Sequence, residues 1–331
     1  MEENIQQAMS DEILEDAAKR YGIPADDIVK IGGFENFVFG YTKGDQDYIL
    51  RFVHSDHRTY NLVLAEIEFI DYLAHNGGSV STVIHSTFDR IVERIALPGD
   101  AYFSVSAFTK APGDYVKPDD LTPQFYTMFG REVARLHNLS ATFQPTHRRP
   151  HWYEENFHDI ALRVLDESDR EIIEAYDAIE FSIRDLPQNE HNYGLIHTDL
   201  HFGNMYYDKQ KLTFFDFDDC SYKHHLSDIV IILFYHFFRE QLSDQEYNDQ
   251  SRYILKHFLT GYRELRDWDM EFMRHINDFL QLRTVILYIV LVAAGSETME
   301  NPRRKAAMQR MRERVLHRSM DLDLDYVLRD L

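Results

Sequence analysis

The order of strand-like and helix-like segments constrains the fold more than any other feature of this sequence. After a helical pattern at 11–21, residues 27–53 contain three short runs rich in β-branched and aromatic residues, separated by glycine-containing turns. Such runs predict an antiparallel meander. A helix is expected at about 60–76, where apolar residues recur in helical register. Three further strands are expected at 80–86, 90–97 and 101–108.

The chain changes character at the segment TKAPGDY, residues 109–115, where proline and glycine lie close together. Beyond it most of the sequence is helical in pattern. The expected helices are 121–139, 155–184, 226–241, 244–264, 269–294 and 302–319. Strands followed by helices predict an α+β protein of two lobes, with residues 1–108 as an N-terminal lobe, a hinge at about 109–113 and residues 109–331 as a helical lobe.

The charge of the chain narrows the class of partner. Asp and Glu number 56 against 35 Lys and Arg, a formal net charge of −21. Such an acidic protein is poorly suited to nucleic acid or to an anionic membrane surface, so we expect neither partner. The same charge would attract small cationic ligands or simply keep the protein in solution. The oligomeric state stays open.

Localisation is predicted from the cysteine content and the apolar runs. A single cysteine, Cys220, cannot form an internal disulfide, which is typical of a reducing compartment. The N-terminal segment is acidic and unlike a secretory signal. The longest apolar run, 284–294, has eleven residues, fewer than the roughly 18 to 20 that cross a bilayer. We therefore expect a cytoplasmic protein.

The segment 194–219, GLIHTDLHFGNMYYDKQKLTFFDFDD, concentrates acidic and imidazole groups around two apolar runs. We expect 194–197 and 211–217 to pair as a hairpin. Asp199, Asn204 and Asp216 would then converge, and like charges at that distance require a compensating cation. Carboxylate and amide oxygens suit Mg²⁺.

The pattern His197-x-Asp199, Asn204 and Asp216 resembles the catalytic core of the kinase-like phosphotransferases, which include aminoglycoside phosphotransferases and choline kinases. The resemblance implies a bilobal protein-kinase-like fold that uses ATP and Mg²⁺ to phosphorylate a small-molecule hydroxyl. It makes Asp199 the catalytic base, Asn204 and Asp216 metal ligands, and His197 a structural residue. Some relatives use GTP.

The family pattern extends to other segments in the expected order. The segment 32–41 resembles the loop that covers the nucleotide phosphates, and it contains Gly33 and Asn36. Arg51 stands where the family carries a strand lysine, and a helix glutamate, Glu66, would hold it. The remaining implied positions are Thr109 and Ala111, whose main chain would bind adenine, and Asp228, which would brace the catalytic loop.

Several assignments have competitors within the sequence. Glu68 rivals Glu66 as the partner of Arg51. Asp218 rivals Asp216 as the metal ligand, because alternation along a strand places both on one face. Asp219 and Glu240 are candidates for binding an amine-bearing acceptor such as an aminoglycoside, amino alcohol or amino acid.

Two alternative functions also remain. The same fold serves protein Ser/Thr kinases. In a second class, a transition-metal hydrolase, the segment HTDLH would supply His197, Asp199 and His201 as ligands.

Overall fold

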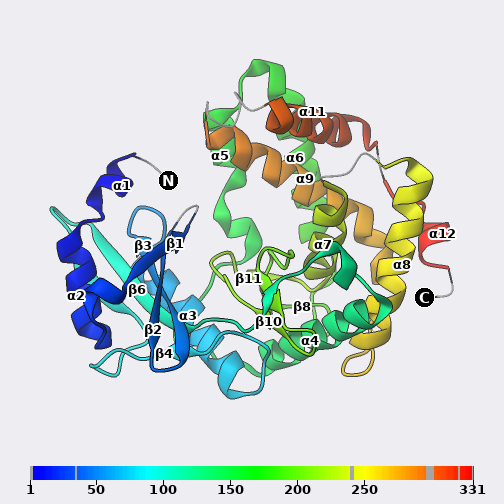
Figure 1. The fold of residues 1–331 in the computed structure, drawn as a ribbon. Coiled ribbons are helices and arrows are strands. Elements are labelled where there is room, and N and C mark those ends of the chain that lie inside the picture. Colours follow the sequence, from blue (N-terminus) through cyan, green and yellow to red (C-terminus); the bar gives the residue numbers. More distant parts are fainter. Residues whose placement is uncertain (1–2, 34–35, 239–241, 296–301, 320, 330) are drawn as a thin grey trace. The chain divides into compact units, whose positions relative to one another are not determined.

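The computed structural model describes residues 3–33, 36–238, 242–295, 302–319, 321–329 and 331. It divides into two compact units. Unit 1 comprises Met1–Tyr115, Thr142–Arg149 and Gly203–Cys220, and unit 2 comprises Val116–Ala141, Pro150–Phe202 and Ser221–Leu331 (Figure 1). The predicted lobe boundary at 108–109 stays a prediction, and short segments from the middle of the chain belong to unit 1.

Unit 1 is built on an antiparallel sheet in the order β1-β2-β3-β6-β4, with β5 also paired to β6. The strands are β1 (Val29–Gly32), β2 (Phe37–Lys43), β3 (Gln46–His54), β4 (Val83–Ile84), β5 (Glu93–Ala96) and β6 (Tyr102–Thr109). The predicted strands therefore exist, although β4 is much shorter than the run 80–86.

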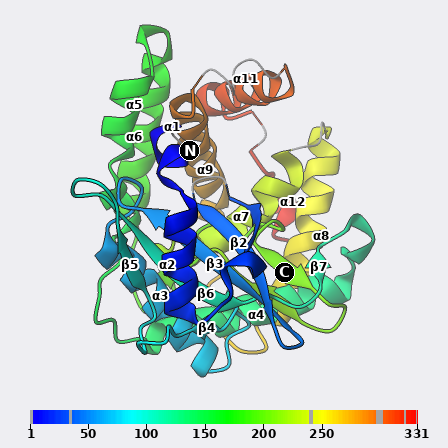
Figure 2. The same cartoon turned by 60° about the vertical axis from the view of Figure 1, so that its left-hand side comes forward.

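Helices cover both faces of this sheet. They are α1 (Glu3–Ala8), α2 (Asp11–Tyr21) and α3 (Tyr60–His75). Leu50 and Phe52 pack in one core cluster with Ala17 and Tyr21 of α2. Because strand side chains alternate, Arg51 faces the opposite side, which α3 covers (Figures 1 and 2).

A second, three-stranded sheet of unit 1 joins residues far apart in sequence. It consists of β7 (Asp114–Tyr115), β9 (Met205–Tyr207) and β10 (Leu212–Phe214) in the order β10-β9-β7. Phe214 also forms a bridge to Val80, so this sheet is tied to the segment that precedes β4.

Unit 2 is mainly helical and contains one small sheet. Its helices are α4 (Pro123–Thr142, whose last residue falls in unit 1), α5 (Phe157–Val164), α6 (Arg170–Arg184), α7 (Leu226–Phe238), α8 (Asp244–Tyr262), α9 (Ile276–Ala293), α11 (Pro302–His317) and α12 (Leu324–Val327). The two strands are β8 (Tyr193–Ile196) and β11 (Ser221–His224). Figure 2 shows α5 and α6 side by side.

Two predictions about local structure are wrong. The single helix expected at 155–184 is divided into α5 and α6, because the backbone is extended at Leu165 and Asp166 caps a short turn that follows. The expected hairpin of 194–197 with 211–217 does not form. Instead β8 pairs with β11, and β10 pairs with β9.

The helix α9 continues a short turn that begins at Phe272. Together they form a 22-residue apolar stretch, Phe272–Ala293, long enough by composition to cross a membrane. Its most apolar window is 56% buried, and α9 contacts α5, α6, α7 and α11. This packing is typical of the central helix of a globular domain.

Candidate functional site

The sheet of unit 1 presents a buried ion pair to α3. Nη2 of Arg51 lies 2.6 Å from Oε2 of Glu66, and Glu66 is fully buried. Glu66 shares one helical stripe with Val63, Ile67 and Ile70, and this register turns it towards the sheet. The predicted pairing of Arg51 with Glu66 is therefore present.

The rival residue Glu68 has a different task. Its carboxylate accepts hydrogen bonds from the main-chain nitrogens of Thr146 and His147, at 2.7 and 2.9 Å. These bonds hold the Thr142–Arg149 segment within unit 1. Glu68 therefore anchors a loop, and Glu66 binds the arginine.

The two predicted metal ligands flank the β9–β10 hairpin. Asn204 immediately precedes β9, and Asp216 lies two residues beyond β10. The amide of Phe215 donates to the carbonyl of Asn204 at 3.1 Å, which extends the ladder past its last strand pair. The side chains of Met205 and Phe214, which pair across the hairpin, are buried and fix it in place. Asn204 and Asp216 are thus brought to the same end of one rigid element.

Asp216 has the features of a residue shaped for binding. It adopts φ = 65°, a left-handed conformation that costs about 1–3 kcal/mol in a non-glycine residue and recurs at functional sites. Its side chain is 52% exposed, so a ligand can reach it, and its Oδ1 lies 3.6 Å from Nη1 of Arg51. The pKa of Asp216 is raised to about 7. Burial is the main cause, Arg51 opposes it, and the neighbouring carboxylates Asp218, Glu66 and Asp219 add to the rise.

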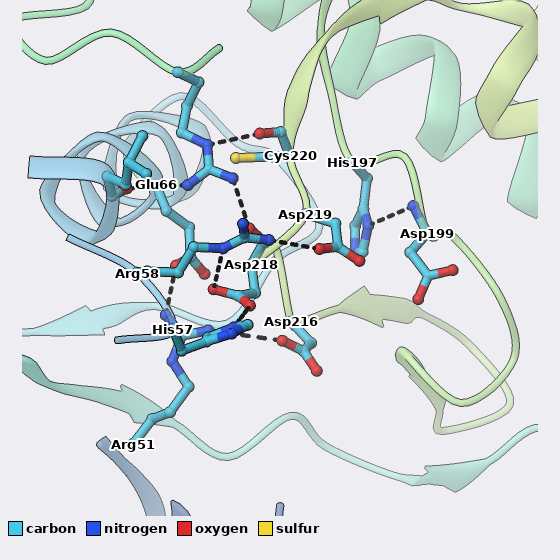
Figure 3. A network of polar contacts seen from close by, with 12 residues as sticks. Arg51, His57, Arg58, Glu66, His197, Asp199, Asp216, Asp218, Asp219 and Cys220 are labelled. Atoms are coloured by element: carbon cyan, nitrogen blue, oxygen red, sulfur yellow. Dashed lines mark hydrogen bonds and ion pairs between the residues drawn. The ribbon is translucent and has the colours of Figure 1, made fainter. Parts of the chain in front are cut away.

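Asp218 and Asp219 are held by the loop that follows β3. Nε2 of His57 lies 2.7 Å from Oδ2 of Asp218, and Nη2 of Arg58 lies 2.9 Å from Oδ1 of Asp219 (Figure 3). Since β10 ends at Phe214, the expected strand alternation of Asp216 and Asp218 does not apply. Asp218 is buried and engaged by His57, which favours Asp216 as the metal ligand. Asp219, a candidate for the acceptor, is bound to Arg58.

Arg149, which the sequence-based predictions do not include, is a fully buried residue that secures residues 215–220. Its guanidinium donates to the carbonyl oxygens of Cys220 and Asp218, both at 2.6 Å, and to that of Leu62 in α3 at 3.1 Å. Arg149 thereby ties residues 215–220, the acidic loop between β10 and β11, to the helix that carries Glu66. Burial also raises the pKa of the Cys220 thiol to about 12.

The predicted phosphate loop connects β1 and β2. Gly33 has φ = 118°, and a Cβ atom there would lie 1.8 Å from the carbonyl oxygen of Asn36, so this position requires glycine. Asn36 is buried at the start of β2. The structure therefore places both residues between β1 and β2, at the edge of the sheet.

The predicted adenine-binding segment lies at the end of β6. The amide of Thr109 donates to the carbonyl of Thr82 at 2.9 Å, and the amide of Lys110 donates to that of Asp47 at 3.0 Å. These two N–H groups are used within unit 1. A main-chain donor for adenine would come from the buried residue Ala111.

In unit 2 the predicted catalytic loop leaves β8 and is braced by α7. Oδ1 of Asp228 accepts a hydrogen bond from the amide of Thr198 at 2.8 Å, and Thr198 itself has φ = 67°. Oδ2 of Asp228 lies 3.1 Å from Nε2 of His137, and burial raises the pKa of Asp228 to about 6. His197 is buried, and its Nδ1 accepts from the amide of Asp199 at 3.3 Å. These contacts fit a supporting role for both residues.

The predicted base, Asp199, is held by side chains of unit 2. Nη2 of Arg283, in α9, lies 2.6 Å from its Oδ1, and Nε2 of His201 lies 3.3 Å from its Oδ2. Although burial opposes ionisation, Arg283 first and then the two histidines, His201 and His197, hold the pKa of Asp199 well below its usual range. Asp199 is therefore an ionised acceptor.

Glu240 lies outside the described residues. Across the parts of the chain that the structure describes, no group of three His, Cys, Asp or Glu is arranged to hold a metal ion. The HTDLH segment instead uses His201 to contact Asp199.

Comparison with known proteins decides between the remaining functions. The model of the phosphotransferase enzyme family (APH) matches residues 28–268, about three quarters of the chain. The chain belongs to this family. Membership confirms the phosphotransferase prediction and shows that the hydrolase alternative is wrong.

Two amicoumacin kinases are similar to this chain over most of its length. The chain is 31% identical to amicoumacin kinase of Bacillus subtilis (strain 168) over 288 residues, covering 85% of this chain and 84% of that protein. The solved structure of an amicoumacin kinase, hAmiN, in complex with AMP-PNP, Ca²⁺ and Ami has 27% identity and a TM-score of 0.89, covering 96% of this chain and 97% of that one.

A microcompartment-associated aminopropanol kinase has a TM-score of 0.73 at 20% identity, covering 94% of this chain and 99% of that one, and shares the fold. The predicted kinase-like α+β fold is confirmed.

Proposed function

We propose that this phosphotransferase moves the γ-phosphoryl group of ATP to a hydroxyl group of a small molecule, with Mg²⁺ as the divalent ion. The observation that carries the proposal is the position of Arg51, which contacts both Glu66 and Asp216. A guanidinium fixed by a buried glutamate and placed beside a metal-binding carboxylate is suited to a nucleotide phosphate. The amicoumacin kinase solved with AMP-PNP and Ca²⁺ supports this donor and a divalent ion.

The residues of unit 1 fit a magnesium ion. The amide oxygen of Asn204 and the carboxylate of Asp216 are hard oxygen ligands at the end of one hairpin. Burial and the neighbouring carboxylates raise the pKa of Asp216, and a divalent cation would favour its ionised form. When bound, the ion would neutralise charge on the β- and γ-phosphates. Gly33 and the Ala111 main chain are proposed to contact the phosphates and adenine.

Asp199 is proposed to act as the catalytic base. Its ionised carboxylate would accept a hydrogen bond from the acceptor hydroxyl and orient the oxygen for in-line attack. The new bond forms between that oxygen and the γ-phosphorus, while the bond to the β,γ-bridging oxygen breaks and ADP leaves. The hydroxyl proton passes to Asp199 and then to solvent. His197 and Asp228 would hold the loop in place.

The acceptor is proposed to be an amine-bearing alcohol of the amicoumacin type. The 31% identity to an amicoumacin kinase, over most of both chains, supports this class. The formal charge of −21 is consistent with a cationic ligand. The compartment is proposed to be the cytoplasm, in keeping with a single, buried cysteine.

The direct test is ADP release from Mg-ATP, and from Mg-GTP in parallel, across a panel of acceptors. The panel contains amicoumacin, aminopropanol, aminoglycosides, amino acids and sugars. We expect turnover with amicoumacin or another amino alcohol, and none with a protein Ser/Thr substrate. Asp199→Ala should bind Mg-ATP as the parent does and lose turnover by orders of magnitude. Parent-like turnover by this variant would show that the base is assigned wrongly.

A further inference from the structure

The carboxylate of Asp199 is held from the apolar helix α9. Nη2 of Arg283 lies 2.6 Å from Oδ1 of Asp199 and also 2.6 Å from the hydroxyl oxygen of Tyr235, in α7. The guanidinium carbon lies 5.3 Å from the centre of the Tyr235 ring. His201 approaches the other oxygen of Asp199, and its ring lies 4.6 Å from that of Tyr235.

Arg283 occupies a position where a charge is costly. Its neighbours Leu282 and Thr284 are buried, and α9 is otherwise mostly apolar. The Arg283 side chain is 18% exposed and that of Asp199 is 17% exposed. A charged group so poorly hydrated is tolerated when it is paired and hydrogen-bonded. Asp199 and Tyr235 both bind its Nη2, so α9 is specialised at this residue to meet the catalytic loop.

Two side chains hold the carboxylate of Asp199 from different directions. A carboxylate oxygen has two acceptor lone pairs, and Arg283 and His201 approach different oxygens. Rotation of the carboxylate is therefore restricted from two sides. A base fixed in this way would meet the hydroxyl in one orientation, which is how positioning accelerates a transfer.

We propose that Arg283 is a positioning residue for phosphoryl transfer, which fixes the carboxylate of Asp199 while the acceptor hydroxyl binds. The proposal rests on the proposed function, in which Asp199 is the base. Tyr235 aligns the guanidinium through the second bond of the same Nη2 and by contact with its ring.

The charges around Asp199 predict a signature in the pH profile. Among the described residues, the groups that act on its carboxylate include Arg283 from α9, His201 and His197 from the catalytic loop, and the Tyr235 hydroxyl, bound to Arg283, from α7. Burial alone would raise the pKa of Asp199, and Arg283 is the first of the charges that oppose it. Without Arg283 the acid limb of the kcat profile should therefore move to higher pH.

The experiment compares the parent with Arg283→Gln, Arg283→Lys and Tyr235→Phe. It measures kcat at saturating Mg-ATP from about pH 5 to pH 9, because kcat reports groups of the bound complex. The acceptor is the compound identified by the panel, with ATP hydrolysis by water followed in parallel.

The kcat profile of the parent should be flat down to about pH 5, because Asp199 stays ionised there. For Arg283→Gln we expect kcat to fall about tenfold to a hundredfold, and an acid limb to appear within the measured pH range, because burial then raises the pKa of Asp199 unopposed by the guanidinium. KM for ATP should stay within about twofold, since the nucleotide contacts are made elsewhere. Arg283→Lys should keep the acid limb near that of the parent and recover part of kcat. Tyr235→Phe should lower kcat without moving the limb.

The outcomes separate this inference from the function on which it rests. If Asp199→Ala retains full turnover, the proposed function is wrong. If Asp199→Ala is inactive while Arg283→Gln keeps the kcat and acid limb of the parent, the role of Arg283 is refuted alone. If Arg283→Gln misfolds and loses Mg-ATP binding, Arg283→Lys decides, because it keeps the positive charge. An acid limb within the measured pH range in that variant would contradict the proposal.

Discussion

Arg51 and Glu66 form a buried ion pair between β3 and α3, with 2.6 Å between Nη2 and Oε2. Breaking one partner of such a pair leaves the other charge buried, at a cost of about 3–5 kcal/mol. We therefore expect Glu66→Gln to lower the free energy of unfolding by that order and to raise KM for ATP. Urea unfolding and steady-state kinetics measure the two effects.

The control for this variant is Glu68→Gln, two positions along the same helix. Glu68 binds the amides of Thr146 and His147 instead of Arg51. Glu68→Gln should therefore destabilise the protein less than Glu66→Gln and leave KM for ATP near the parent value. Equal effects of the two substitutions on KM would argue against a role of Glu66 in nucleotide binding.

Glycine is required at Gly33, which follows β1, but not at Gly32, the last residue of that strand. In Gly33→Ala the new methyl group would collide with the carbonyl of Asn36, and φ = 118° would be strained. We expect a loss of Mg-ATP affinity of tenfold or more, of the order of 1.4 kcal/mol, measured by calorimetry. Gly32→Ala meets no atom within 4 Å and should bind as the parent does.

Asp216 should release protons when the metal–nucleotide complex binds. Its pKa of about 7 exceeds the ordinary value, so the folded, metal-free protein holds more protons than the unfolded chain between about pH 4 and pH 7. Over that window rising pH weakens stability through this group, and a bound cation reverses the effect by favouring the ionised form.

Calorimetry of Mg-ATP binding at pH 7, in buffers of different ionisation enthalpy, should detect release of about half a proton. Saturating Mg²⁺ keeps the nucleotide itself ionised. Asp216→Asn should bind more weakly and release less. No difference in proton release between the two proteins would contradict the environment described for this carboxyl group.

Arg149 should contribute to both stability and nucleotide binding. Hydrogen bonds to a charged group are worth about 1.5–3 kcal/mol each, and Arg149 makes three to main-chain carbonyls. Arg149→Met should lower the free energy of unfolding by about 3 kcal/mol or more and weaken Mg-ATP binding.

Arg148→Met removes the same charge from an exposed neighbour and should change stability by about 0.5 kcal/mol or less. Arg149→Lys should recover little, because an ammonium cannot reach three carbonyls in the manner of a planar guanidinium. A stable Arg149→Met protein with normal Mg-ATP affinity would show that the acidic loop is held by other contacts.

The sequence was most informative where local signals act over short distances. The helix expected at 11–21 matches α2, since Gly22 adopts the left-handed conformation that ends it. The pairing of β8 with β11 was not predictable in the same way. Strands of three or four residues carry almost no periodicity, and their partners lie more than twenty residues away.

The residues of the candidate site also differ in how far the sequence could identify them. Asp199, Asn204 and Asp216 belong to a compact motif, so the resemblance to the family pattern could point to them. Arg149 and Arg283 come from distant segments, and their importance lies in burial that only the fold reveals. One signal was available for Arg283, because a lone arginine within the apolar run of α9 requires a partner.

The carbonyl of Cys220 lies under the guanidinium of Arg149, and its thiol is sealed from solvent with a pKa of about 12. Thiolate is the form that reacts with alkylating agents, so the native sulfur should be silent towards maleimide probes while the chain is folded. Cysteines introduced at chosen surface positions would then carry fluorophores or spin labels without a cysteine-free background. Slow labelling of the native protein would in turn report transient loss of the contacts between Arg149 and the acidic loop.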